Sequence, residues 1–240
     1  MTLSEIFFRG FLSLYFFPKF VDIGITTRQA LSRFCQTSDA RSSGNPSPQA
    51  SGNGSIMRLA PVPIRYAEFF PDRLDTLVQC AVESSLTTHA SPQCLSGCAY
   101  LTLILCGLMH GRSRDEVLSA NWEPLEWLRG STDLHPEIDE VARGSFRTRR
   151  PPEIRGSGYV VKSLEAALWA FNKSDNFRDG ALLAVNLGDD ADTTGAVYGQ
   201  IAGAVYGYEA IPEPWRESIA MKSTILEMTD RLASAAGIAI

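Results

Sequence analysis

The densest group of potential ligand atoms in this chain lies in one short acidic stretch. Three carboxylates (Asp189, Asp190 and Asp192) and two hydroxyls (Thr193 and Thr194) fall within six residues. Such oxygens are hard donors that suit Mg²⁺, Mn²⁺ or Ca²⁺ rather than zinc. Because residues two apart on a helix do not share a face, Asp190 and Asp192 can converge on one ion only where the chain is still turning before a helix begins.

The same residue types also suit an interpretation that needs no metal. Aspartate and threonine are favoured at the first turn of a helix, where their oxygens accept free backbone N–H groups and complement the helix dipole. A helix of small residues is expected directly after the acidic stretch, over residues 196–208. Composition alone leaves both the metal site and the helix cap open.

This helix carries a glycine at every fourth position, Gly195, Gly199, Gly203 and Gly207. A glycine inside a helix costs about 1 kcal/mol relative to alanine, so four on one stripe predict that another backbone packs very close to it. The same spacing is typical of dimerising membrane helices. The polar Gln200 and the acidic stretch at the start favour an interior helix that holds the carboxylates rigidly.

A second candidate site is a short glycine-rich segment made of Gly52, Asn53, Gly54 and Ser55. Two glycines around an asparagine allow a close backbone approach and can present successive N–H groups to phosphate oxygens. A plain turn uses the same residues, so this pattern alone does not decide between them. Taken alone, His89 is typical of a structural histidine at a helix end, and residues 22–24 indicate only a helix start.

The elements expected around these residues are nearly all helical, and no convincing strand alternation is present. Helices are predicted over residues 25–34, 72–86, 91–109, 159–171, 176–185 and 214–235, with a further start at the capping box of Ser113. Ser91 and Pro92 mark the start of the third of these helices. The helix over residues 159–171 has one apolar face, formed by Val160, Leu164, Ala167, Leu168 and Phe171. A Ser/Gly/Pro/Asn-rich loop, residues 38–54, is long enough to be functional.

The overall composition is that of an ordinary globular protein. The 240 residues, of which 45% are hydrophobic and 20% charged, suffice for one well-buried domain. A formal net charge of −5 argues against nucleic-acid binding, and the interrupted basic run over residues 143–155 favours a solvated loop. Five cysteines without a CxxC pair and three scattered histidines give no zinc pattern. They predict reduced thiols in a cytoplasmic protein.

The N-terminal residues 6–21 are strongly apolar. They include the six phenylalanines Phe7, Phe8, Phe11, Phe16, Phe17 and Phe20. A signal peptide or membrane anchor would also be apolar, but Arg9, Pro18 and Lys19 interrupt the run and no small-residue cleavage site follows. We therefore expect no membrane insertion. We expect exposed core residues that promote self-association or poor solubility.

Taken together and in order, several segments resemble the ADP-ribosylglycohydrolase family, which includes the dinitrogenase-reductase-activating glycohydrolases. The matching segments are residues 22–27, 52–61, 85–89, 158–161, 164–169 and the acidic stretch with its glycine helix. The acidic motif is highly specific, and the Gly-Asn-Gly-Ser-x-Met-Arg segment is moderately so. This co-occurrence favours the metal interpretation of the acidic stretch.

The resemblance implies an all-α fold, a single orthogonal helical bundle, with a two-magnesium centre in a cleft that binds ADP-ribose. Members of the family cleave the bond between ribose C1 and an acceptor such as an arginine or serine side chain. The resemblance assigns the metal ligands to Asp190, Asp192 and Thr193, with Mg²⁺ as the ion and Mn²⁺ as the alternative. It assigns substrate binding to Gly52, Asn53, Gly54, Ser55, Met57, His89 and Tyr159, and a catalytic role near the reacting ribose to Asp22.

One departure from the family pattern concerns the metal. The family has a Gly-Asp-Ala-Leu-Gly helix and then a Thr-Asp-Asp-Thr motif that supplies the other half of the ligands, and neither occurs upstream of Asp22. We therefore expect one N-terminally truncated domain over residues 1–240 that binds metal weakly. The expected partner is an ADP-ribosylated protein or an ADP-ribose-containing small molecule. The function is then either that of a hydrolase impaired by the missing ligands or that of a non-catalytic ADP-ribose-binding or structural (crystallin-like) protein.

Overall fold

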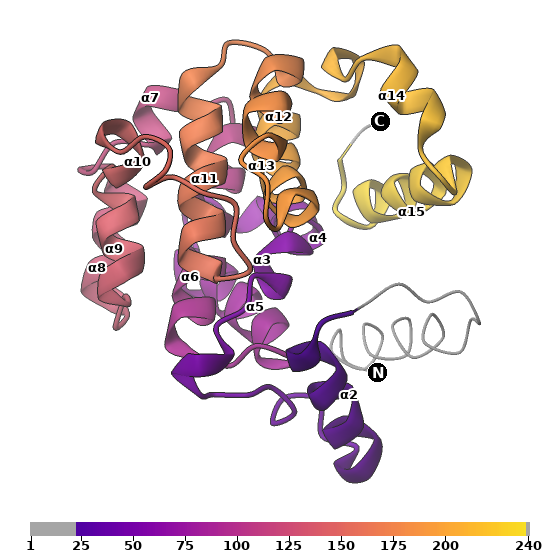
Figure 1. Ribbon diagram of the computed structural model, residues 1–240. Helices are drawn as coiled ribbons and strands as arrows, with labels where there is room; N and C mark the ends of the chain where they lie inside the picture. The colour runs from indigo at the N-terminus through magenta and orange to yellow at the C-terminus, as the bar shows by residue number, and fades with distance from the viewer. Residues whose placement is uncertain (1–22, 239–240) are drawn as a thin grey trace.

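Helices form the secondary structure of the computed structural model, which describes residues 23–238. No strand occurs in this range, although two isolated backbone bridges join Asn45 to His89 and Gly52 to Tyr159. The predicted all-α fold is therefore confirmed. The α-helices, shown in Figure 1, are α2 (Ile25–Thr37), α3 (Gly54–Met57), α4 (Pro61–Arg65), α5 (Leu74–Leu86), α6 (Pro92–Met109), α7 (Arg114–Val117), α8 (Glu123–Ser131), α9 (Pro136–Ala142), α10 (Ser145–Thr148), α11 (Val160–Lys173), α12 (Phe177–Val185), α13 (Ala191–Tyr206), α14 (Glu213–Ser218) and α15 (Lys222–Ala235).

Helix α6 is the centre of the hydrophobic core. Fifteen of its 18 residues are buried, and it packs against α3, α4, α5, α9, α11 and α13. It begins as predicted, because Ser91 Oγ accepts the N–H of Cys94 and Pro92 takes the first position. By length and composition it is the one helix among the described residues that could cross a membrane, and most of it is buried inside the fold.

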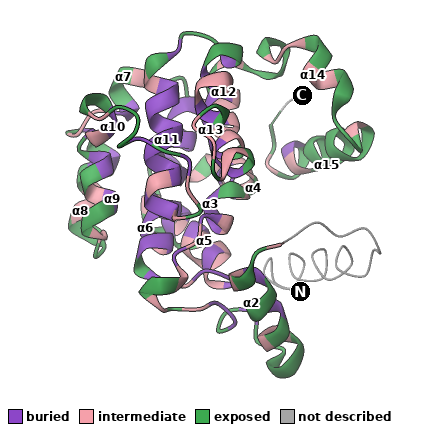
Figure 2. Ribbon diagram, in the orientation of Figure 1, coloured by how far each residue is buried: buried purple, intermediate pink, exposed green. Residues whose placement is uncertain are grey.

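Helix α11 lies beside α13 in the same core and packs against α9, α10 and α12 as well. All five residues predicted to form its apolar stripe are buried. Figure 2 shows buried residues along α6 and α11 in the middle of the fold, with exposed residues on the outer helices. The acidic stretch and the glycine-rich loop are therefore both attached to this rigid centre.

The glycine stripe of α13 differs from the expectation. A Cβ atom on Gly195 would lie 2.9 Å from Val185, but on Gly199 or Gly203 it would meet no described atom within 4 Å. Gly207 ends the helix, with a φ of 76°. The prediction of a close backbone along the whole stripe is therefore wrong for residues 23–238. The helix buries Val197, Tyr198 and Ile201 and packs against α6, α11 and α12.

The single helix predicted over residues 214–235 is also wrong. Helix α14 already ends at Ser218, and α15 begins only after Met221, whose φ of 57° is left-handed, so the two helices are separate. Helix α15 contacts α4 and buries only Ala233. Large apolar side chains remain exposed in α15 and in the segment between α14 and α15. They are Ile219, Met221, Ile225, Leu226 and Met228.

The remaining helix predictions hold with small shifts at the helix ends. Helices α2, α5 and α12 occupy the predicted segments, whereas α3, α4, α8, α9 and α10 were not predicted. All of these except α8 are too short to show a helical period. All five cysteines are free. Asp22 and the N-terminal aromatic segment lie outside the described residues.

Candidate functional site

The glycine-rich loop is fixed to the start of α11 by backbone hydrogen bonds. The N–H of Asn53 donates to the carbonyl of Gly158 at 3.0 Å, and the N–H of Val160 donates to the carbonyl of Ser51 at 3.0 Å. On the side of α6, the Cys94 thiol donates to the carbonyl of Gly52 at 3.2 Å. These hydrogen bonds fix the loop to α6 and to the start of α11, so it is not an isolated turn. Because the N–H of Asn53 is occupied, only the following N–H groups can serve a phosphate cradle.

The side chain of Asn53 joins this loop to the acidic stretch. Its Nδ2 donates to Asp190 Oδ2 at 2.5 Å and to the carbonyl of Ser157 at 3.1 Å. Asn53 is 7% exposed. Two segments that are 137 residues apart in the chain thus meet at one buried amide.

Asp190 occupies the position before α13 but does not act as a helix cap. Its side chain accepts no backbone N–H of the helix. The two carboxylate oxygens accept from Asn53 and, at 3.3 Å, from the hydroxyl of Thr193. The cap interpretation of this carboxylate is therefore wrong, and the carboxylate faces the glycine-rich loop.

The helix begins earlier than predicted, because the carbonyl of Asp190 already accepts the N–H of Thr194 at 3.0 Å. Asp192 consequently lies inside the first turn of α13 and is exposed. Thr193 is buried, and its hydroxyl lies 3.5 Å from the sulfur of Met57. The family resemblance assigns Met57 to substrate binding. Asp190, Asp192 and Thr193 fall within one turn, but only Asp190 lies before the helix, so the shared metal site stays a prediction.

The donor set of this turn suits a hard cation in kind but is small in number. Two carboxylates and one hydroxyl are the oxygen chemistry that Mg²⁺ prefers, whereas Mg²⁺ needs six oxygens, some of them from water. Among residues 23–238 no group of three or more His, Cys, Asp or Glu side chains is arranged to hold a metal. These residues fit part of a magnesium shell, and the metal assignment stays a prediction.

Gly156, which lies outside the segments matched to the family, lets two loops approach each other. A Cβ atom on Gly156 would collide with the carbonyl oxygen of Gly188, and one on Gly158 would lie 4.0 Å from Asp190 Oδ2. The Gly-Ser-Gly sequence at residues 156–158 is a turn signal that could have indicated this third loop. The candidate site therefore consists of three loops pressed together, not two.

Gln200 is a second residue whose role the sequence analysis missed. From α13 its Nε2 donates to the carbonyls of Ile56 at 2.9 Å and Met57 at 3.0 Å. Its Oε1 accepts the N–H of Ala60 at 2.7 Å. These bonds reach backbone groups at the end of α3 and just after it. They fix the residues after the glycine-rich loop to the helix that follows the acidic stretch.

His89 lies directly beneath the glycine-rich loop and is 3% exposed. A Cβ atom on Gly54 would lie 2.9 Å from the His89 ring, and one on Gly52 would lie 3.3 Å from its Nε2. The imidazole therefore leaves no room for a side chain at Gly54 and little room for one at Gly52. Burial, followed by the charge of Arg58, lowers the pKa of His89 to about 3, so the ring is neutral near pH 7.

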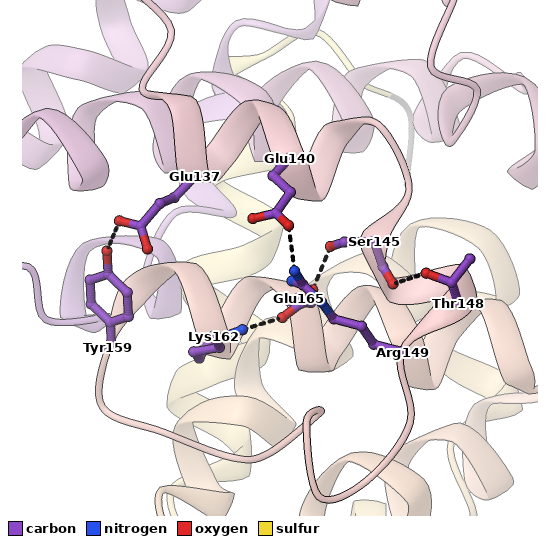
Figure 3. A network of polar contacts seen from close by, with 8 residues as sticks. All are labelled: Glu137, Glu140, Ser145, Thr148, Arg149, Tyr159, Lys162 and Glu165. Carbon is purple, nitrogen blue, oxygen red and sulfur yellow. Dashed lines mark hydrogen bonds and ion pairs between the residues drawn. The ribbon is translucent and has the colours of Figure 1, made fainter.

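Tyr159 lies at the edge of the same loop, and its hydroxyl donates to Glu137 of α9, as Figure 3 shows. Burial and then Glu137 raise the pKa of Tyr159, so the phenol stays protonated. Further along α9 and α11, Figure 3 shows that the buried Glu165 accepts from Ser145, Arg149 and Lys162. That cluster neutralises a core carboxylate and anchors the start of α11.

A cavity of about 780 Å³ lies away from these residues, where α5, α7 and α8 meet. Trp122 and Trp127 line it, together with Asp75, Asp115 and Glu123. Each of these carboxylates lies in the first turn of its helix, where it complements the helix dipole. The acidic rim of this cavity is thereby explained by the helices themselves.

Comparisons with known proteins agree on one group of relatives. A sequence model described as ADP-ribosylglycohydrolase matches residues 9–238. The ADP-ribosylarginine hydrolase Tri1 of Serratia proteamaculans is 38% identical over 211 residues, which are 88% of this chain and 54% of that protein. The ADP-ribosyl-[dinitrogen reductase] glycohydrolase of Rhodospirillum rubrum is 28% identical, over 91% of this chain and 67% of that protein.

A solved structure described as an ADP-ribosylglycohydrolase-related protein complex has the same fold. It superposes with a TM-score of 0.79 at 35% identity, covering 97% of this chain and 73% of that chain. The chain spans about half the length of the two Tri1 proteins that it matches, 54% and 53%.

Proposed function

Because the chain belongs to the ADP-ribosylglycohydrolase family, we propose that it binds ADP-ribose and hydrolyses the bond between ADP-ribose and an acceptor. The 2.5 Å contact between Asn53 and Asp190 is the observation that supports this most directly. It joins a loop suited to a diphosphate with a turn suited to a cation and ribose hydroxyls. Arginine is the acceptor to test first, since similar proteins are named ADP-ribosylarginine hydrolases.

Each candidate residue then has a defined task. The N–H groups of Gly54 and Ser55 would face the diphosphate, and Tyr159 would form a wall beside it. Mg²⁺ held by the acidic turn would act as a Lewis acid on ribose hydroxyls and water. The proposed ligands are Asp190, Asp192 and Thr193. Asp22 would move a proton near ribose C1.

A second function is favoured by one observation. The described residues contain no group of three His, Cys, Asp or Glu side chains that could hold a metal. A chain with a weak metal site could bind ADP-ribose without cleaving its substrate. The second candidate is therefore a non-catalytic ADP-ribose-binding protein.

The test measures release and binding separately. The full chain is incubated with a protein ADP-ribosylated on arginine, with and without Mg²⁺, and free ADP-ribose is quantified. ADP-ribose itself is titrated by calorimetry. Asp190→Asn is compared with Asp230→Asn, a matched change on the exposed face of α15.

If Asp190→Asn no longer releases ADP-ribose and Asp230→Asn still does, the result supports the proposed hydrolase activity. Binding of ADP-ribose without release supports the second candidate. A wild-type chain that neither binds nor releases ADP-ribose refutes both.

A further inference from the structure

A buried chain of polar side chains runs beneath the glycine-rich loop, from Arg58 through Thr88 to His89. Arg58 Nη2 donates to Thr88 Oγ1 at 2.8 Å, and Thr88 Oγ1 lies 2.7 Å from His89 Nδ1. The same Nη2 also contacts the carbonyl of Ser84 at 3.1 Å and Thr87 Oγ1 at 3.2 Å. Thr88 is 4% exposed and His89 3% exposed, so water has little access to these contacts.

The direction of the hydrogen bonds follows from what each group can do. A guanidinium only donates, so Thr88 Oγ1 is the acceptor from Arg58. The hydroxyl proton of Thr88 then needs an acceptor of its own, and His89 Nδ1 is the one within reach. Because a neutral imidazole carries its proton on one nitrogen, Nδ1 as acceptor places that proton on Nε2.

The Nε2–H of His89 points to the candidate site. Nε2 lies 3.3 Å from the position of a Gly52 Cβ and 3.2 Å from that of a Gly54 Cβ. None of the residues described by the structure accepts a hydrogen bond from it. This donor is therefore available to an oxygen of a bound ligand.

We propose that Arg58 and Thr88 are positioning residues that hold His89 in the Nε2–H tautomer, so that the ring offers a neutral donor to an anionic ligand oxygen at the loop. The ligand class rests on the proposed function, whereas the tautomer does not. Neither Arg58 nor Thr88 touches the ligand. They act through the histidine.

The first test reads the tautomer directly. The chain has three histidines, so the ring ¹⁵N resonances of His89 can be assigned by comparison with His89→Gln. We expect wild type and Thr88→Ser to show a protonated Nε2 and an unprotonated Nδ1. Thr88→Val has almost the same shape but no hydroxyl, and we expect it to show a mixture of both tautomers. A wild-type ring protonated on Nδ1, or a Thr88→Val spectrum identical to wild type, overturns the proposal.

The second test reads the consequence for binding, with ADP-ribose as the probe in calorimetry. Thr88→Val should weaken binding roughly tenfold, the effect of one hydrogen bond to a charged acceptor. Thr88→Ser should stay within about twofold of wild type. Thermal unfolding of both variants identifies any loss of folding. Equal affinities of folded Thr88→Val and Thr88→Ser contradict the proposal. If wild type does not bind ADP-ribose, the proposed function fails and the spectra alone decide the tautomer.

Discussion

At the scale of single residues, the direction of the Asp190 side chain decides how the acidic stretch is understood. The residue types permit a helix cap or a metal ligand equally well. The carboxylate turns to Asn53 and Thr193 and caps no backbone N–H. No local pattern could predict this, because the partner Asn53 is 137 residues away.

Substitutions of Asp190 can separate its structural contact from its charge. Asp190→Asn keeps an oxygen that can accept from Asn53, so we expect its free energy of unfolding to lie within about 0.5 kcal/mol of wild type. Asp190→Ala leaves the buried amide of Asn53 with one acceptor fewer and should cost about 1–2 kcal/mol. Urea unfolding measures both. Equal losses in the two variants would show that charge, not the hydrogen bond, supports the fold.

His89 predicts a pH dependence of stability. Burial and then Arg58 lower its pKa to about 3 in the folded protein, against about 6.5 in the unfolded chain. Between these values the unfolded chain binds a proton that the folded protein does not, so stability falls as pH falls through this window. At about pH 5 the loss from this group is about 2 kcal/mol, and above about pH 6.5 it contributes no pH dependence.

The measurement compares urea unfolding of wild type and His89→Gln at about pH 7.5 and about pH 5. Wild type should lose about 2 kcal/mol more than the variant over this interval, because carboxylates affect both proteins alike. Equal losses would mean that His89 is not neutral and buried as the structure has it.

At the scale of elements, the sequence predicted where the longer helices lie. It did not predict which face of α13 is covered, or where α13 begins. The start of α6 and the apolar stripe of α11 are local patterns, and both were predicted. The start of α13 and the break at Met221 depend on single backbone conformations, which periodicity does not report. The glycine stripe was misjudged because composition cannot say which face of a helix another element covers.

The glycines of these helices predict substitutions of opposite effect. Gly199→Ala and Gly203→Ala add a methyl group that meets no atom of residues 23–238, and each should stabilise the protein by about 1 kcal/mol through helix propensity. Gly180→Ala, in α12, would collide with the hydroxyls of Tyr198 and Ser174 and should cost about 1–3 kcal/mol. Thermal unfolding tests all three. Destabilisation by Gly199→Ala would mean that the glycine face is covered in the protein.

At the scale of the whole molecule, the three loops of the site are held by contacts between distant segments. The family resemblance named most of the residues that meet there, and the structure adds Gly156, Ser157 and Gln200. Sequence reasoning missed these three because small residues and a lone glutamine carry no chemistry of their own. Their role exists only once α3, α11 and α13 are packed together.

The small donor set predicts a weak response of the whole protein to magnesium. With a dissociation constant at or above about 1 mM, Mg²⁺ at about 1 mM stabilises by less than about 0.5 kcal/mol. Thermal unfolding with and without Mg²⁺ measures this, and Asp190→Asn should abolish the remaining shift. A stabilisation of about 3 kcal/mol would require further ligands and would refute the weak site.

Asn53 leaves the ribosome long before Asp190, because 137 residues separate them. Until Ser157 and Asp190 have been synthesised, the amide of Asn53 lacks both of its acceptors. Contacts of such large sequence separation form late in folding, since a long segment of chain must first be ordered between them. As long as α11 and α13 have not packed against α3, the three loops of the candidate site are not joined. The contacts that shape the candidate site therefore depend on nearly the whole chain being in place, whereas the start of α6 depends only on neighbouring residues.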